Sequence, residues 1–305
     1  MKNGQICIGL ESTAHTFGAS IVDTDGNIIS DVKDIYKAPK GSGIHPREAS
    51  RHHSNIANEV IQRAIEQAKI KYTELDIISY SAGPGIGPCL RVGATAARAL
   101  SLKLNKPLVP VNHAIGHIEL GKLLTGASNP LVLLVSGGHT MLLAFLDKQW
   151  RVFGETLDIT LGQLLDQFGR SIGFASPCGK NIEELASASS NYVTLPYSVK
   201  GNDVSFSGLL SATKSVAKKS KVDACYSLQE TAFAMISESV ERALSFTNKK
   251  ELMIVGGVAA NKRLSEMLTD VCKRHGSKFF VVPLQYAGDC GSQICWTGLL
   301  ESQVK

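Results

Sequence analysis

Two histidines spaced four residues apart are the most informative chemical feature of this sequence. His113 and His117 lie in the segment Asn112-His113-Ala114-Ile115-Gly116-His117. This spacing places both imidazoles on one face of a helix, and Asn112 is a suitable N-cap for that helix. The pair predicts a metal site, although a packed or exposed histidine pair is an equally common result of this spacing.

A metal site needs at least one further donor, because two histidines do not complete it. Asp289, in Ala287-Gly288-Asp289-Cys290-Gly291, lies at the start of the last predicted helix and is the best candidate. As an N-cap of that helix it would have a structural role instead. Ala114 occupies the position of the glutamate in the metalloprotease motif H-E-x-x-H. The sequence therefore offers no general base for peptide hydrolysis.

The elements that must position these residues occur twice. A strand, a Gly/Ser/Thr turn ending in His-Thr and a returning strand are predicted at 6–22 and again at 131–145. Each copy has a later apolar strand, at 76–80 or 252–255, that leads through glycines into a helix. Backbone amides at such turns can receive phosphate, although any one turn is equally well explained as a tight hairpin. Together they predict a nucleotide held between two related lobes.

Apolar periodicity predicts further helices. These span residues 47–70, 91–104, 161–172, 207–217, 226–246, 261–275 and 288–302.

Composition and charge limit the class of protein. The chain has 305 residues, of which 44% are hydrophobic and 19% charged, as in ordinary globular proteins. Its apolar stretches are far shorter than the roughly 18 residues of a membrane span, and no signal-peptide pattern precedes Glu11. Seven scattered cysteines without a C-x-x-C pair favour a reducing compartment. We expect a cytoplasmic protein without membrane contact, whose net charge of +5 permits a polyanionic partner.

Longer motifs carry a family resemblance. The sequence resembles the universal tRNA threonylcarbamoyl transferases (the Kae/TsaD/Gcp group), most closely the archaeal and eukaryotic branch that forms the catalytic subunit of the KEOPS complex. The matching segments cover essentially the whole chain. They include ESTAHT at 11–16, GIHPREA at 43–49, GPGIGPCLRV at 83–92, VNH at 111–113, VFGETLDI at 152–159, DVSFSGLL at 203–210, QETAFA at 229–234 and GGVAAN at 256–261.

The resemblance implies an α/β, two-lobed actin-like ATPase (ASKHA) fold with duplicated lobes and a nucleotide and metal cleft between them. The expected parts are a first lobe at 1–125, a second lobe at 126–287, and a terminal helix at 288–305 that packs back toward the first lobe. The implied reaction transfers the threonylcarbamoyl group from threonylcarbamoyl-AMP to the N6 amine of the adenosine beside the anticodon, in tRNAs that read codons beginning with A. The amine attacks directly, so no covalent nucleophile is expected.

The implied partners are tRNA and KEOPS subunits, including a small kinase/ATPase and a bridging subunit. Because the sequence ends soon after its last predicted helix, no fused kinase is expected. Four basic residues of the first lobe are candidates for tRNA contact: Lys37, Lys40, Arg47 and Arg51.

Carried over position by position, the resemblance assigns one divalent metal ion, iron or zinc, to His113, His117 and Asp289. It assigns the adenylate, or a nucleotide of the ATP or AMP type, to residues of the second lobe. These are Leu134, Val135, Ser136, Gly137, Gly138, Asp166, Gly179, Glu183 and Asn261.

Three departures from the family pattern affect these sites. Leu134 stands where the archaeal branch has a tyrosine metal ligand, so His15 or the substrate is expected to supply a further ligand. The usual Pro-Gly-Gly-Pro turn reads Pro177-Cys178-Gly179-Lys180, which adds a side chain and a charge near the expected nucleotide. Cys290 replaces an asparagine. We expect a retained site with an altered metal preference.

Other classes of function stay open. The altered positions would also suit a nucleotide-binding scaffold that organises partner subunits without turnover. A metalloprotease is disfavoured by Ala114. An ASKHA sugar kinase or ATPase would need a carboxylate base near a sugar site, and the sequence shows no such site.

Overall fold

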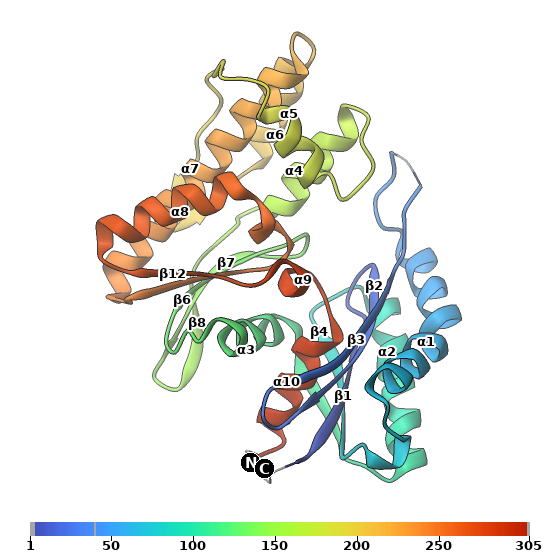
Figure 1. The fold of residues 1–305 in the computed structure, drawn as a ribbon. Coiled ribbons are helices and arrows are strands. Elements are labelled where there is room, and N and C mark those ends of the chain that lie inside the picture. Colours follow the sequence, from blue (N-terminus) through green and yellow to red (C-terminus); the bar gives the residue numbers. More distant parts are fainter. Residues whose placement is uncertain (1–3, 40, 304–305) are drawn as a thin grey trace. The chain divides into compact units, whose positions relative to one another are not determined.

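A computed structural model describes residues 4–39 and 41–303 (Figure 1). Lys40, one of the candidate tRNA contacts, lies outside the described residues. The chain divides into two compact units. Unit 1 comprises Met1–Ala38, Ile44–Leu124 and Gly288–Lys305, and unit 2 comprises Pro39–Gly43 and Thr125–Ala287.

Unit 1 is built on a sheet with the strand order β3-β2-β1-β4-β5. The first three strands form an antiparallel meander, while β4 and β5 run parallel to β1. Helices α1 and α2 pack on one side of this sheet and α10 packs on the other (Figure 1). The elements are β1 (Ile6–Glu11), β2 (Thr16–Asp23), β3 (Ile28–Ile35), α1 (Pro46–Ala68), η1 (Tyr72–Glu74), β4 (Ile77–Gly83), α2 (Gly87–Leu104), β5 (Leu108–Asn112), α3 (His113–Thr125) and α10 (Gly291–Glu301).

Unit 2 repeats this plan, with the strand order β8-β7-β6-β11-β12. Again three strands form an antiparallel meander, and β11 and β12 run parallel to β6. The elements are β6 (Leu131–Val135), β7 (Thr140–Leu146), β8 (Gln149–Glu155), α4 (Leu161–Ser171), α5 (Gly179–Ala186), β9 (Val199–Lys200), β10 (Asp203–Val204), α6 (Ser207–Ala217), α7 (Lys221–Thr247), β11 (Glu251–Val255), η2 (Gly257–Ala260), α8 (Lys262–His275), β12 (Lys278–Val281) and α9 (Leu284–Ala287). The predicted duplication is thus confirmed, since both sheets share one strand order and one set of strand directions.

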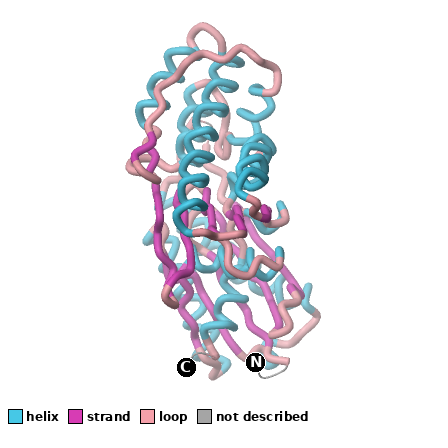
Figure 2. Tube along the Cα trace, turned by 90° about the vertical axis from the view of Figure 1, so that its left-hand side faces the viewer, coloured by secondary structure: helices cyan, strands magenta, loops and turns pink. Residues whose placement is uncertain are grey.

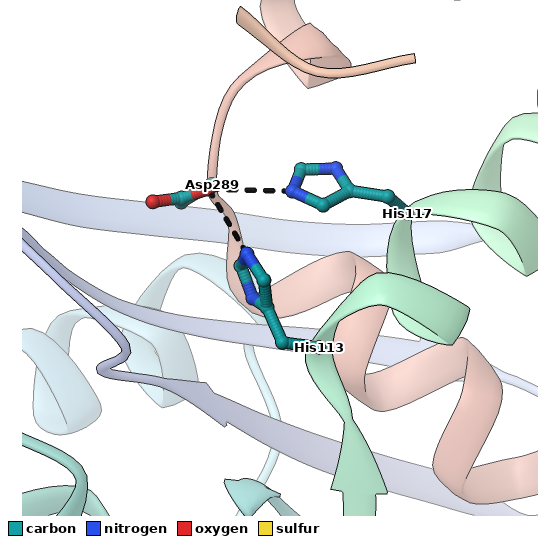
Figure 3. A group of neighbouring side chains, drawn as sticks. All are labelled: His113, His117 and Asp289. Atoms are coloured by element: carbon teal, nitrogen blue, oxygen red, sulfur yellow. Dashed lines mark hydrogen bonds and ion pairs between the residues drawn. The ribbon is translucent and has the colours of Figure 1, made fainter. Parts of the chain in front are cut away.

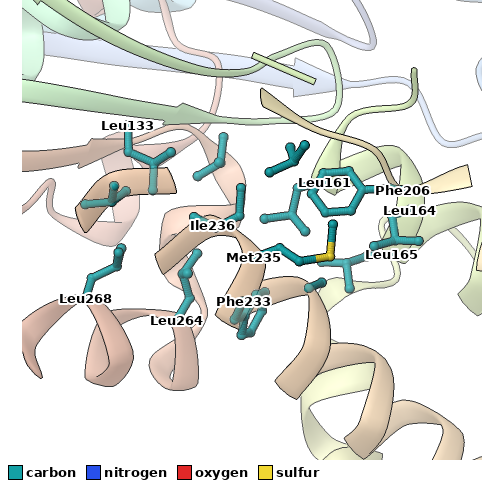
Figure 4. Packing of buried hydrophobic residues seen from close by; sticks show 14 of the residues in the cluster. Leu133, Leu161, Leu164, Leu165, Phe206, Phe233, Met235, Ile236, Leu264 and Leu268 are labelled. Carbon is teal, nitrogen blue, oxygen red and sulfur yellow. The ribbon is translucent and has the colours of Figure 1, made fainter. Parts of the chain in front are cut away.

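The core of unit 2 surrounds α7, whose central turn is buried on several sides. Phe233, Met235 and Ile236 are at most 2% exposed. Leu264 of α8 and Leu164 of α4 belong to the same apolar cluster (Figure 4). The helices at the top of Figure 2 are those of unit 2, gathered on one side of its strands. Burial of such side chains contributes about 2 kcal/mol each, so α7 anchors the helices that carry the nucleotide-binding candidates.

Three helix starts differ from the sequence prediction by three or more residues. Helix α2 begins at Gly87 rather than 91. Helix α7 begins at Lys221 rather than 226, because the Ser220 hydroxyl caps it by accepting a hydrogen bond from the Asp223 amide at 3.2 Å. Helix α10 begins at Gly291 rather than 288. In the part of the chain that the structure describes, no helix combines the length and apolarity needed to cross a bilayer.

Glycines let α10 lie directly against the sheet of unit 1. A Cβ added at Gly9 of β1 would lie 2.3 Å from the Cys295 amide nitrogen. One added at Gly291 would lie 2.5 Å from the Ser20 amide nitrogen. Both contacts involve backbone atoms, which cannot rotate away. The position of α10, and of Asp289 just before it, therefore depends on these glycines.

We expect Gly9→Ala to lower the free energy of unfolding by about 3 kcal/mol, because overpacking against backbone forces α10 away from the sheet. Urea unfolding of the variant measures this loss. Gly87→Ala is the matched control in the same unit, since a Cβ added there meets no atom within 4 Å. Equal stability of the two variants would contradict the packing described.

Asp158 joins two of the motifs noted in the sequence. Its carboxylate accepts hydrogen bonds from the Ser205 hydroxyl at 2.6 Å and from the amides of Phe206 and Ser207 at 2.8 and 3.0 Å. It thereby caps α6, whose N-cap residue Phe206 makes no side-chain cap. Partial burial acts to raise the pKa of Asp158, but these donors outweigh it and hold the pKa well below the ordinary value.

We expect Asp158→Asn to lower the free energy of unfolding by about 1.5 kcal/mol at pH 7, because its hydrogen-bond donors lose a charged acceptor. A lowered folded-state pKa stabilises the protein above the unfolded-state pKa of about 3.9, and this contribution is lost as pH falls further. The difference in the free energy of unfolding between wild type and Asp158→Asn, measured with urea, should therefore be smaller at pH 3 than at pH 7. Asp147→Asn, at an exposed position paired only loosely with Arg151, is the control.

Candidate metal centre and nucleotide-binding turns

The two histidines and Asp289 come together within unit 1 (Figure 3). The Asn112 side chain caps α3 as predicted, accepting hydrogen bonds from the amides of Ala114 and Ile115 at 2.9 and 3.2 Å. His113 Nε2 lies 3.5 Å from Asp289 Oδ1, and His117 Nε2 lies 3.3 Å from the same oxygen. One ligand atom from each of the three residues lies within 4.8 Å of the others.

Burial and charge prepare this group for a cation. The side chains of His113, His117 and Asp289 are 5, 2 and 16% exposed. Burial lowers the pKa of His117. Burial also acts to lower the pKa of His113, but the charge of Glu11 outweighs it and raises that pKa to about 9. Desolvation acts to raise the pKa of Asp289, yet its contact with His117 and the nearby imidazoles hold it below the ordinary value, so the carboxylate stays ionised.

A buried carboxylate behind His113 was not recognised from the sequence. Glu11 at the end of β1 is completely buried. Its Oε2 accepts a hydrogen bond from His113 Nδ1 at 3.0 Å, and its Oε1 accepts one from the Thr13 amide at 2.6 Å. Gln293 of α10 donates to Oε2 at 3.3 Å. A charged residue that ends an apolar strand was the available signal for Glu11.

The structure decides the N-cap alternative for Asp289. Cys290, not Asp289, is the N-cap residue of α10, and its side chain makes no cap. The Cys290 thiol is buried and donates to Gln293 Oε1 at 3.9 Å. Among the described residues, His15 is not a member of the group of mutually close ligand atoms, although its charge also favours ionised Asp289.

This donor set fits a divalent transition metal. Two imidazole nitrogens and one carboxylate oxygen are ligands typical of Fe²⁺ and Zn²⁺ sites. Glu11 supplies the hydrogen bond to the second histidine nitrogen that ligating histidines almost always make. The three side chains are only 2–16% exposed, so they are not an ordinary cluster of charged groups on the surface.

The predicted nucleotide-binding residues lie in unit 2, where the two glycine turns contact each other. The Ser136 hydroxyl accepts hydrogen bonds from the amides of Gly138 and His139 at 3.2 and 3.0 Å, which shapes the turn after β6. Gly256, with φ of +96°, follows β11, and a Cβ there would lie 2.3 Å from the Val135 carbonyl oxygen. Leu134 and Val135, at the end of β6, are completely buried.

Three polar residues tie the helices of unit 2 to one another. Asp166 Oδ1 accepts a hydrogen bond from the Cys178 amide at 2.7 Å, just before Gly179 begins α5. Glu183 Oε1 accepts one from the Lys262 amide at 2.8 Å. The Asn261 side chain caps α8 and donates to Gln229 at 3.0 Å, a partner that sequence reasoning missed. Asp166, Glu183 and Asn261 thus link α4, α5, α7 and α8.

The departures in the turn at 177–180 are structurally mild. Cys178 is completely buried and packs on Gly169, where an added Cβ would lie 2.3 Å from the Cys178 Cβ. The added side chain points into the apolar core of unit 2. The Lys180 side chain is 86% exposed and lies 3.9 Å from Glu184.

Comparison with known proteins agrees with the motifs. The family model for TsaD, tRNA N6-adenosine threonylcarbamoyltransferase, matches residues 26–296. A "probable bifunctional tRNA threonylcarbamoyladenosine biosynthesis protein" of Methanothermobacter thermautotrophicus is 50% identical over 97% of this chain and 55% of its own length. The chain thus spans about half the length of this relative. A tRNA N6-adenosine threonylcarbamoyltransferase of Caldivirga maquilingensis is 46% identical, over 97% of this chain and 89% of its own length.

Solved structures confirm the fold class. The match with HypF of T. kodakarensis covers 100% of this chain and 48% of the HypF chain, at a TM-score of 0.70 and 13% identity. At this identity the likeness concerns the fold alone, and a ROK family glucokinase from Streptomyces griseus also matches, at a TM-score of 0.52 and 13% identity. The duplicated sheets and the sequence relatives lead to one conclusion: the chain belongs to the tRNA N6-adenosine threonylcarbamoyltransferase family.

Proposed function

We propose that this chain transfers the threonylcarbamoyl group from threonylcarbamoyl-AMP to the N6 amine of the adenosine beside the anticodon, in tRNAs that read codons beginning with A. One observation carries the proposal: a chain of this family brings His113, His117 and Asp289 together as a largely buried donor set. Family membership supports tRNA as the substrate.

Unit 1 would hold one divalent ion, iron or zinc, through His113, His117 and Asp289. When bound, such an ion supplies Lewis-acid polarisation of a carbonyl oxygen. The chain's own contribution is orientation and the exclusion of water. Glu11 holds His113 with its Nε2 toward Asp289. The small exposure of all three side chains keeps water away from an activated acyl group that would otherwise hydrolyse.

Unit 2 would hold the adenylate. The turn at 136–138 is glycine-rich and follows a strand, as phosphate-binding turns do. Its Ser136 and Gly138 amides make hydrogen bonds within the turn, so the Gly137 amide is the proposed donor to phosphate. Asp166 and Glu183 each use one carboxylate oxygen to accept a backbone amide. Their second oxygens are the proposed acceptors for ribose hydroxyls. Asn261 supports these residues by capping α8.

The proposed transfer is direct. A bond forms between the adenosine N6 and the carbamoyl carbon, the bond from that carbon to the phosphate oxygen breaks, and the amine loses a proton as AMP leaves. The cysteines do not suit a covalent route, because burial raises the pKa of thiols such as Cys225 to about 12 and Cys272 to about 11. A thiol of this kind is not a ready nucleophile at neutral pH.

We also propose that the chain works with KEOPS-type partners, a small kinase/ATPase and a bridging subunit. Several relatives of about twice the matched length are named bifunctional, which supports an activity shared with further protein. Lys37, Arg47 and Arg51 are exposed in unit 1 and are the proposed tRNA contacts among the described basic residues. The cytoplasm is the proposed compartment, because tRNA is found there and buried free thiols suit it.

The test is incubation of the pure, metal-loaded chain with threonylcarbamoyl-AMP and unmodified tRNA, with and without the partner subunits. Nucleoside analysis of the recovered tRNA should detect threonylcarbamoyladenosine in at least one combination. If threonylcarbamoyladenosine is absent from every combination, the proposed transferase activity is wrong, and a nucleotide-binding scaffold explains the chain better.

A further inference from the structure

The imidazole of His113 is held from behind by two side chains that come from opposite ends of the sequence. Glu11 stands 102 residues before His113, and Gln293 stands 180 residues after it. Both are completely buried. Gln293 Nε2 lies 3.1 Å from His113 Nδ1, and both nitrogens lie within hydrogen-bond distance of Glu11 Oε2.

The backbone fixes Glu11 in this place. It is the last residue of β1, and the Thr13 amide donates to its Oε1, so the carboxylate cannot swing toward solvent. Its Oε2 then receives two converging N–H groups, one from His113 and one from Gln293. A buried carboxylate with three donors is fully compensated. Because a carboxylate only accepts hydrogen bonds, His113 donates through Nδ1, and its Nε2 is the ring nitrogen that faces Asp289.

Gln293 links the two segments that carry the metal ligands. It lies one turn after Asp289, in the first turn of α10, and its amide reaches the first residue of α3. Gly116, between the two histidines on α3, makes this approach possible, because a Cβ there would lie 3.3 Å from Gln293 Cγ. One side chain therefore sets the position of Asp289 relative to the histidines.

We propose that Glu11 and Gln293 are positioning residues of the metal centre, which together fix the tautomer and ring orientation of His113 and the separation of α3 from α10. The inference rests on the proposed metal site in unit 1. Partners of ligating histidines typically contribute about 10–100-fold in metal affinity. We expect Glu11→Gln to weaken metal binding by about 10–100-fold and Gln293→Met by about 10-fold.

Asp31 provides a matched control. Its carboxylate also holds the first turn of α10, accepting a hydrogen bond from the Ser292 hydroxyl at 3.1 Å, and it also contacts Ser20. These two serine partners of Asp31 are not metal ligands of the proposed site. Asp31→Asn thus loosens α10 to a similar degree without touching the imidazole.

The experiment is titration of the whole chain with Co²⁺, monitored by visible absorption and by competition with a chelator. Urea unfolding of each variant confirms folding. Wild type should bind one Co²⁺, Glu11→Gln and Gln293→Met should bind more weakly with altered absorption bands, and Asp31→Asn should match wild type. Weakening by Asp31→Asn equal to that of Glu11→Gln would show a structural role only and overturn the proposal.

Two further outcomes separate this inference from the metal site itself. If wild type binds Co²⁺, His117→Ala abolishes binding, and both positioning variants match wild type in affinity and spectrum, the inference is wrong and the metal site stands. If wild type binds no Co²⁺, or binds it equally after the double change His113→Ala/His117→Ala, the metal site fails and the inference falls with it.

Discussion

Replacing His117 with alanine is expected to remove the bound metal and to reduce threonylcarbamoyl transfer by about 100-fold or more, because the carbonyl then loses several kcal/mol of Lewis-acid stabilisation. His117 Nε2 lies 3.3 Å from Asp289 Oδ1, and the His117 side chain is almost completely buried. Its loss leaves two donors, too few for a stable site. Elemental analysis and initial rates measure the two effects.

His52→Ala is the control for this change. His52 also lies in unit 1, but it pairs with Asp34 at 2.8 Å and is not a member of the ligand group found among the described residues. It should keep both metal and activity. A His117→Ala protein that still holds one metal per chain would show that the assigned ligands are wrong.

Replacing Asp166 with alanine is expected to raise KM for threonylcarbamoyl-AMP by about 100-fold with a small change in kcat, because a charged acceptor and the support of a turn are lost together. Asp166→Asn separates the two roles. Asparagine can still accept the hydrogen bond from the Cys178 amide, so it loses only the charge offered to the ribose. We expect it to raise KM by about 10-fold.

Steady-state kinetics with varied threonylcarbamoyl-AMP give kcat and KM for Asp166→Ala and Asp166→Asn and so distinguish the two roles of Asp166. Glu184→Gln is the control, since Glu184 lies on α5 near Lys180 at the surface. A fall in kcat at unchanged KM in Asp166→Ala would contradict a role in ground-state binding of the adenylate.

The hairpins of both sheets could be predicted because their strands are buried and apolar. Strand β6 is buried throughout, and β1 nearly so. Strand β8 was not predicted, since most of its residues are exposed and show no alternation. Strand β12 is short and mostly exposed or half-buried at the sheet edge. Pairing with β7 and β11, rather than local pattern, makes them strands.

The same distinction applies to the site. The histidine pair is a local pattern within one helical turn, and it was visible in the sequence. Glu11 and Gln293 reach His113 only through the sheet and α10, across separations of 102 and 180 residues. Cys178 shows the converse case, in which a residue notable in the sequence turns its side chain into the core. Residue type alone did not reveal that orientation.

Single-turnover transfer tests the central claim most directly. The metal-loaded chain, with its partner subunits, is mixed with threonylcarbamoyl-AMP carrying isotope-labelled threonine and with unmodified tRNA. Label entering tRNA and AMP released are measured in the same sample. The account predicts one AMP for each labelled adenosine and little AMP release without tRNA. AMP release without labelled tRNA would contradict it, because the chain would then be hydrolysing the adenylate instead of transferring its acyl group.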